Sequence, residues 1–203
     1  RNMPKISSYT FESWFKKRKA NTTGSRGKIV FFHDTHINYI HPEVGKSAVK
    51  ILESAGYEVE ITDRKCCGRT LISKGLLEEA KKYVDYNTNL LSSYVEAGIK
   101  IVGIEASCVS AIQDELPDLA DQREKAQKIS DNTFTIQDLI MQIQNDGKQQ
   151  IKWNETNKDL LLFVHCHERA LNGTTNSLGS LNLPGKFKAN LIDAGCCGMA
   201  GSF

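Results

Sequence analysis

Residues 28–68 read KIVFFHDTHINYIHPEVGKSAVKILESAGYEVEITDRKCCG, and this stretch decides the fold. It opens with the short apolar run Ile29–Phe32, which predicts a buried strand. Pro42 suits the first turn of a helix, and apolar residues then recur at helical spacing as far as Gly56, a residue that suits a helix end. Tyr57–Thr62 alternates like a second strand. Strand, helix and strand in this order are typical of a βαβ unit, which favours a parallel sheet.

The same kind of pattern continues along the chain. Helices are expected over Leu71–Ala97, residues 109–129 and Thr133–Asn145, with a strand over Ile99–Ile104. A second series then starts, with a buried strand over Leu160–Val164, a helix over Arg169–Leu181 and a strand over Lys188–Ile192. This recurrence indicates an internal repeat.

The cysteines follow that repeat. When His33 is aligned with His165, Asp34 falls on Cys166, and the next Cys-Cys pair follows after 32 positions in the first copy and 30 in the second. We therefore predict an α/β fold made of two Rossmann-like βαβ repeats with parallel strands, related by a pseudo-two-fold axis. The expected division is a linker or connector over residues 1–27, a first repeat over 28–150 and a second over 151–203. Aromatic residues of the connector are expected to form a small docking turn: Phe11, Trp14 and Phe15.

The bulk composition excludes several classes of protein. The 203 residues are 40% hydrophobic and carry a net charge of only +2, which gives no reason to expect a nucleic-acid partner. No apolar run approaches the length of a membrane span, and no secretory signal is visible. The expectation is a cytoplasmic protein, with peripheral membrane association left open for a longer polypeptide.

Six cysteines are the candidate metal ligands, and each lies beyond the carboxyl end of a predicted strand, where open α/β sheets build their sites. They are Cys66, Cys67, Cys108, Cys166, Cys196 and Cys197. Thiolates bind zinc, copper(I) and the iron of iron–sulfur clusters. Zinc sites usually use C-x-x-C pairs, whereas both pairs here are adjacent, which suits a polynuclear cluster better. A vicinal disulfide or thiol-exchange site, and inert core cysteines, stay open as alternatives.

Four other residues are possible auxiliary ligands: His165, His167, Asp34 and Glu105. The two histidines flank Cys166 and are expected to pack beside the site rather than to bind metal. Asp34 and Glu105 are oxygen ligands or helix caps, and the cap interpretation is preferred. His33, His36 and His41 line the matching loop of the first copy. No residue is assigned a catalytic role.

Several motifs together resemble one family. They are Cys66-Cys67-Gly68-Arg69, Glu105-Ala106-Ser107-Cys108-Val109-Ser110, His165-Cys166-His167 and Gly195-Cys196-Cys197-Gly198-Met199-Ala200-Gly201. The chain resembles the cysteine-rich CCG domain family, which includes the B-type subunits of heterodisulfide reductase. Within it, residues 28–203 are most similar to the C-terminal iron–sulfur part of FAD-linked oxidases of the D-lactate and D-2-hydroxyglutarate dehydrogenase type.

The resemblance implies a 4Fe-4S-type cluster in each repeat, but this sequence departs from the family pattern. Asp34 stands where the family has its first cysteine, and Glu105 stands where its C-x-x-C begins. Each repeat therefore has three cysteines, and the second lacks the C-x-x-C. Zinc in place of a cluster, or no metal at all in this segment, stays open.

The function implied by the resemblance is electron transfer. A 2-hydroxy acid would be oxidised at an FAD on an N-terminal flavin domain of the same polypeptide. Electrons would then pass through clusters in this segment to a quinone or another acceptor, and the segment alone would not turn over substrate. Two alternatives stay open: a thiol- or heterodisulfide-binding redox site, and a zinc-stabilised assembly module.

Overall fold

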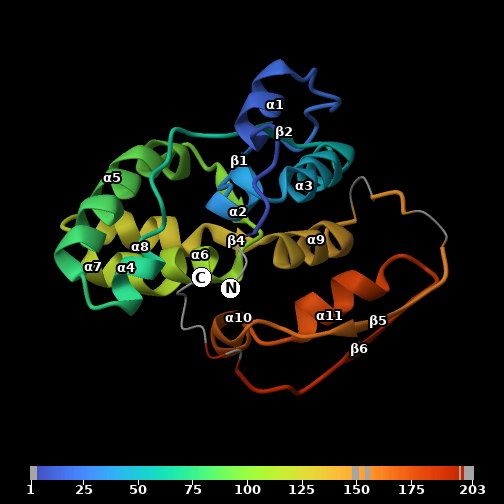
Figure 1. Cartoon of the computed structure of the whole chain (residues 1–203). Coiled ribbons are helices and arrows are strands. Elements are labelled where there is room, and N and C mark those ends of the chain that lie inside the picture. The colour runs from blue at the N-terminus through green and yellow to red at the C-terminus, as the bar shows by residue number, and fades with distance from the viewer. Residues whose placement is uncertain (1–3, 148–150, 154–155, 197, 199–203) are drawn as a thin grey trace.

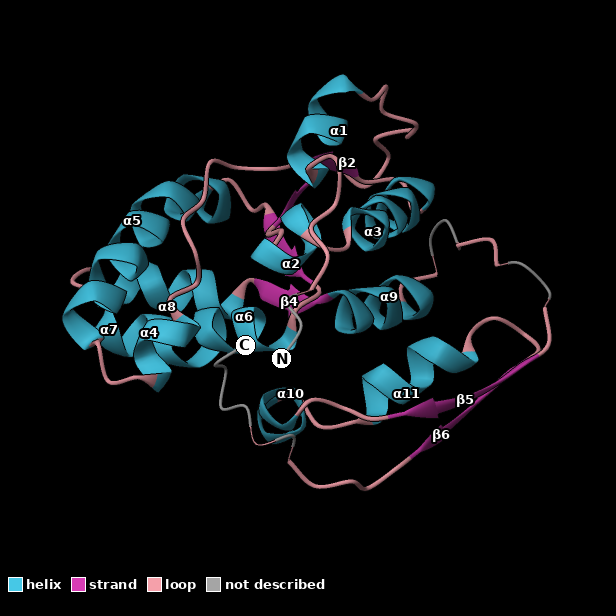
Figure 2. Cartoon of the chain, viewed as in Figure 1, coloured by secondary structure: helices cyan, strands magenta, loops and turns pink. Residues whose placement is uncertain are grey.

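The computed structural model describes residues 4–147, 151–153, 156–196 and 198. The chain forms two parallel sheets with helices packed around them (Figures 1 and 2). The larger sheet has the strand order β2-β1-β3-β4, with β1 at Lys28–Phe31, β2 at Glu58–Glu60, β3 at Lys100–Gly103 and β4 at Thr133–Thr135. The smaller sheet pairs β5, Lys158–Leu162, with β6, Phe187–Leu191.

Helices connect the strands as the βαβ pattern requires. They are α1 Phe11–Lys17, α2 Thr35–Tyr39, α3 Pro42–Ser54, α4 Arg69–Ser73, α5 Leu77–Glu96, α6 Ala106–Ser110, the π-helix η1 Ala111–Glu115, α7 Leu116–Leu119, α8 Arg123–Asp131, α9 Ile136–Asn145, α10 Cys166–Leu171 and α11 Thr175–Asn182. All strand pairs are parallel. The predicted α/β class with parallel sheets is thus confirmed. Among the described helices, none is long and apolar enough to cross a membrane.

The larger sheet is buried on both faces because β1 and β3 are apolar throughout. Ile29 and Phe31 face one core, which is completed by α3, α9 and α1. Val30 and Phe32 face the other, which is completed by α5, α8 and η1. All four side chains are at most 2% exposed. A parallel sheet covered on both faces typically has such continuously hydrophobic strands.

The aromatic residues of the N-terminal segment form helix α1 rather than a turn. The Thr10 hydroxyl caps it by accepting a hydrogen bond from the Ser13 amide at 3.0 Å. Phe11 is fully buried, and its ring lies 5.5 Å from both the Phe31 and the His33 rings. The predicted docking therefore takes place, with Phe11 as its centre.

Three expected helices differ from the structure. The helix predicted over Leu71–Ala97 is divided into α4 and α5, because Gly75 adopts a positive φ of 72° between them. The helix predicted over 109–129 is interrupted as well: η1 precedes Pro117, which has no amide to continue the helical bonds. The residues Thr133–Thr135 form edge strand β4, and Thr135 is the actual cap of α9.

The second sheet is less buried than expected. The stretch Leu160–Val164 predicts a buried strand, but β5 runs over Lys158–Leu162 and Leu161 is 75% exposed. Its neighbour β6 ends with Leu191, which is 45% exposed. A two-stranded sheet leaves its faces open because no third strand or second helix layer covers both of them. Within the described residues, α11 is the helix that packs against β6.

Candidate functional site

Three thiols of the first half meet in one pocket. Cys66 and Cys67 follow β2, and Cys108 lies in α6, which follows β3. The Sγ atoms of Cys67 and Cys108 are 3.1 Å apart. The pocket has a volume of about 270 Å³, and all three cysteines line it. It therefore lies at the carboxyl ends of the parallel strands, as the sequence predicts.

Local backbone features place the Cys66–Cys67 loop. Gly68 has a positive φ of 88°, which allows α4 to begin immediately after Cys67. From α5, the buried Asn87 amide donates hydrogen bonds to the carbonyl oxygens of Lys65 and Cys66, at 3.2 and 3.1 Å. The Asn87 carbonyl oxygen accepts one from the Lys65 amide at 2.9 Å. Helix α5 thus fixes the loop backbone on the side away from the pocket.

The two adjacent thiols hold their protons strongly. The pKa of Cys66 is raised well above its ordinary value, first by the hydrogen bond with Cys67 and then by burial. The pKa of Cys67 is raised mainly by its contact with the Cys108 thiol, and burial adds to this. Both are therefore neutral thiols at physiological pH in the metal-free chain. A bound cation would have to displace these protons.

Asp34 and Glu105 both cap helices at the rim of this pocket. Asp34 Oδ1 accepts a hydrogen bond from the Ile37 amide at 3.0 Å at the start of α2. Glu105 Oε1 accepts one from the Ser107 amide at 3.2 Å at the start of α6. Asp34 is 3% exposed, and its Oδ2 is buried without a partner. Burial raises the pKa of Asp34, and the nearby Glu105 charge raises it further.

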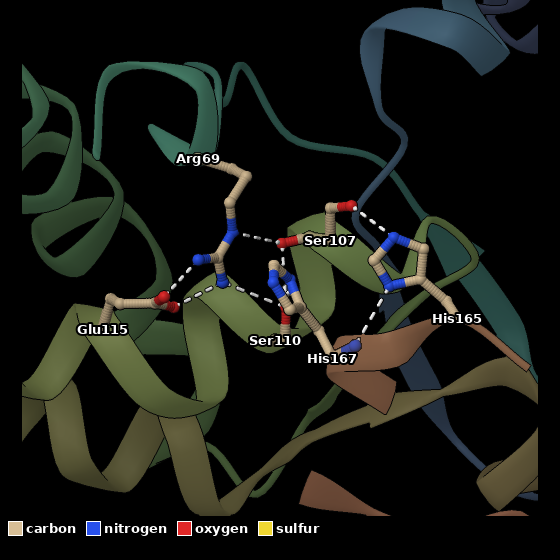
Figure 3. Close-up of polar contacts among 6 residues, drawn as sticks. All are labelled: Arg69, Ser107, Ser110, Glu115, His165 and His167. Carbon is tan, nitrogen blue, oxygen red and sulfur yellow. Dashed lines mark hydrogen bonds and ion pairs between the residues drawn. The ribbon is translucent and has the colours of Figure 1, made fainter. Parts of the chain in front are cut away.

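Arg69 lies beside the thiols and is bonded to several elements (Figure 3). Its guanidinium pairs with the Glu115 carboxylate, donates from Nε to the Ser107 carbonyl oxygen at 3.3 Å, and donates from Nη2 to Ser110 Oγ at 3.1 Å. Two histidines of the second half contact the same serines. Nε2 of His165 is 3.3 Å from Ser107 Oγ, and Nδ1 of His167 is 3.4 Å from Ser110 Oγ.

The cysteines of the second half are placed differently. Cys166 is half-buried and is the first residue of α10, which His165 caps through its Nδ1. Cys196 is exposed, and its Sγ accepts a hydrogen bond from the Gly198 amide at 3.3 Å. Cys197 lies outside the described residues. The structure therefore brings together the first three predicted ligands, and it places Cys166 on the helix whose cap contacts Ser107.

Residues 30–113 match the family model of the cysteine-rich domain CCG. This segment is a CCG domain. The whole chain is 28% identical over 206 aligned residues to the C component of anaerobic glycerol-3-phosphate dehydrogenase, named as one of its subunits, from Escherichia coli strain K12, and covers 51% of that protein. It is 26% identical over 191 residues to lactate utilization protein A of Bacillus velezensis, with 87% of this chain and 74% of the relative aligned. The chain thus spans about half the length of the E. coli relative. No solved structure matches it.

The donor atoms of the CCG domain suit a redox metal group, although they are not preassembled. In the described part of the chain, no three His, Cys, Asp or Glu side chains already form a metal-ligand set. Instead, the thiols bond to one another and retain their protons. The pocket nevertheless offers three sulfur atoms and the partnerless Asp34 Oδ2, which are donors that attract a cationic group. On chemistry, the site fits an iron–sulfur group.

Sequence reasoning misses the polar frame around the thiols. Arg69, Ser107 and Ser110 carry part of the family resemblance without a role of their own, and no motif includes Glu115. The one available signal is that Arg69 directly follows the Cys-Cys-Gly motif of the CCG domain. Its partner cannot be found from spacing, because Glu115 reaches it through the π-helix η1.

Proposed function

We propose that this chain is the iron–sulfur electron-transfer part of a flavin-linked oxidoreductase that acts on a 2-hydroxy acid. The observation that carries the proposal is the meeting of three thiols from two elements in one pocket of the CCG domain. Thiolate sulfurs are the usual ligands of iron–sulfur clusters. The E. coli and B. velezensis relatives bear names that refer to the use of hydroxylated substrates, and the first is named as part of a dehydrogenase.

The residues of this chain would bind and tune the group, while the group itself supplies the storage of single electrons. Cys66, Cys67 and Cys108 would hold it in the first half, and Cys166, Cys196 and Cys197 in the second. Asn87 keeps the carbonyl groups of the Cys66–Cys67 loop turned toward α5. The thiols must lose their protons on binding, so uptake is expected to release protons and to weaken as the pH falls.

The flavin and the electron acceptor would lie outside this chain. A flavin domain or a separate flavin protein would oxidise the substrate and deliver electrons to the thiol-bound group. A quinone or another carrier would then accept them. The E. coli relative is named as one of several subunits, which supports a multi-component assembly of this kind.

Anaerobic reconstitution tests the proposal. The purified protein is incubated with iron and sulfide, and bound iron, acid-labile sulfide and the electron paramagnetic resonance signal of the reduced protein are measured. We expect the wild type to retain both elements and Cys108→Ser to lose the share bound by the first half. Cys166→Ser should lose the share bound by the second half.

Thr70→Ala is the matched control, because Thr70 lines the same pocket but offers no sulfur ligand. It should bind as much iron as the wild type. A wild-type protein that retains no iron and sulfide would contradict the proposal. Retention of one zinc ion per chain, lost in Cys66→Ser, would instead support an assembly module.

A further inference from the structure

Arg69 joins three segments that the chain separates. It is the first residue of α4, two positions after Cys67, and is only 7% exposed. Its Nε bonds the carbonyl oxygen of Ser107, the residue directly before Cys108. Its two Nη atoms bond the Glu115 carboxylate, with Nη2 to Oε2 at 2.6 Å. A single side chain therefore links the Cys66–Cys67 loop to α6 and to η1.

The link spans the gap across which two thiols meet. Cys67 and Cys108 come from different elements and are 41 residues apart in the sequence, yet their Sγ atoms are 3.1 Å apart. Within the described residues, Arg69 is the side chain that bonds the backbone next to Cys108 from a position next to Cys67. Ser110 strengthens the same link, since its hydroxyl accepts from Arg69 Nη2 and donates to the Ser107 carbonyl oxygen at 3.1 Å.

The chemistry of this link is specific to arginine. The planar guanidinium bonds a carboxylate with two parallel N–H groups and still has donors for the serine oxygens. A lysine ammonium keeps the charge but cannot reach Glu115, Ser107 and Ser110 with fixed geometry. Figure 3 shows the guanidinium of Arg69 between Glu115 on one side and the two serines on the other.

We infer that Arg69 is a positioning residue, whose buried guanidinium holds the Cys67 and Cys108 thiols at the separation that the site uses. The inference rests on the proposed function for its purpose, since it concerns the ligands of the same site. The geometry it describes exists in the metal-free chain. Its test can therefore be independent of iron.

The ease with which the two thiols form a disulfide measures their positioning. The metal-free protein is equilibrated with reduced and oxidised glutathione in a Cys66→Ser background, so that Cys67 has one near partner. The two thiols and one glutathione disulfide give one Cys67–Cys108 disulfide and two glutathione thiols, so two electrons pass to the glutathione. Alkylation and mass spectrometry of the peptides then give the equilibrium constant.

We expect Arg69→Lys to lower this equilibrium constant at least tenfold, which for a two-electron couple is a shift of about 30 mV. Arg18→Lys is the matched control. Arg18 forms another buried pair, with Glu53, and both side chains are less than 10% exposed. This pair joins the segment after α1 to α3, away from the thiols. It should change the constant less than twofold, even though it destabilises the fold.

Two outcomes would overturn the inference: Arg69→Lys within twofold of the wild type, or Arg18→Lys with the same effect as Arg69→Lys. If Arg69→Lys does not fold, as judged by circular dichroism, Glu115→Gln takes its place, because it weakens the same link from the other side. It should lower the constant at least threefold, and no change would again reject the role of the link. Failure of iron uptake would contradict the proposed function without affecting this measurement.

Discussion

At the scale of single residues, Asp34 shows how one side chain serves two purposes. Its Oδ1 caps α2 through the Ile37 amide, while its Oδ2 lies buried at the thiol pocket without a partner. An unpartnered buried carboxylate is costly when it is charged. Its pKa is raised by burial and by the Glu105 charge. The metal-free protein is therefore less stable at neutral pH than the same fold would be with a neutral cap.

Asp34→Asn tests this cost. The folded protein holds the Asp34 proton more tightly than the unfolded chain, whose pKa is near the ordinary value of 3.8. The wild type therefore gains its full benefit below that pH and loses stability as the pH rises through the higher folded pKa. Asp34→Asn lacks this loss. In urea titrations of the metal-free protein, its stability relative to the wild type should increase from pH 4 to pH 7.

Asp34→Ala is the control for the cap. It removes the charge and the cap together, so it should be less stable than Asp34→Asn by about 1 kcal/mol. A difference between Asp34→Asn and the wild type that stays constant with pH would contradict the raised pKa. Equal stability of the two variants would contradict the cap.

The thiol ligands were predictable and their frame was not, for a physical reason. Cys66, Cys67 and Cys108 follow the ends of strands that periodicity already indicates, and parallel strands bring such positions to one edge. Asp34 and Glu105 are predicted as caps because carboxylates suit helix starts. The bond between Arg69 and Glu115 depends on the helical phase of η1, and a π-turn changes that phase without a periodic signal.

At the scale of elements, α1 is fixed to the core by a close approach at Gly45 of α3. A Cβ atom at Gly45 would lie 2.5 Å from Ile37 Cγ2 and 2.7 Å from Phe11 Cδ2. The fully buried Phe11 ring therefore packs where a side chain of α3 would otherwise project. The absence of a side chain at Gly45 is what allows α1, α2 and α3 to pack together.

Gly45→Ala should weaken this packing. Alanine improves helix propensity by about 1 kcal/mol, but the overpacking costs about 1–3 kcal/mol and forces Phe11 to move. We expect a net loss of about 1 kcal/mol in urea unfolding and a changed fluorescence of Trp14, which packs beside Phe11. Gly185→Ala is the control, since no heavy atom lies within 4 Å of its added Cβ. Equal stability of the two variants would show that α1 tolerates displacement.

At the scale of the whole molecule, the two halves are held together differently from the interior of the first. The cores around β1 and β3 are apolar and fully buried. Between the halves, side chains make polar contacts, such as Asn176 Nδ2 to Asp138 Oδ1 at 2.7 Å and Asn172 Nδ2 to Gln113 Oε1 at 3.1 Å. Figure 1 shows β5 and β6 at the edge of the molecule, apart from the larger sheet.

The sequence predicted both sheets but not this difference in burial. The run Leu160–Val164 is as apolar as Ile29–Phe32, and apolarity alone indicates a buried strand in each case. Burial also requires a neighbour on each face. The first sheet has helices on both faces, whereas among the described residues β5 pairs with β6 alone. That depends on what surrounds a strand, which its own residues do not encode.

This difference predicts that the second sheet opens before the first. Two paired strands are marginal in water, and polar contacts to the first half add little free energy. In hydrogen–deuterium exchange with mass spectrometry, amides of β5 and β6 should exchange at least tenfold faster than those of β1 and β3, and low urea should widen the gap. Strand β4 is the control, because it is an edge strand of the first sheet. If β4 exchanged as fast as β5 and β6, edge position would explain the effect. Equal opening free energies for β5 and β1 would mean that the two halves unfold as one unit.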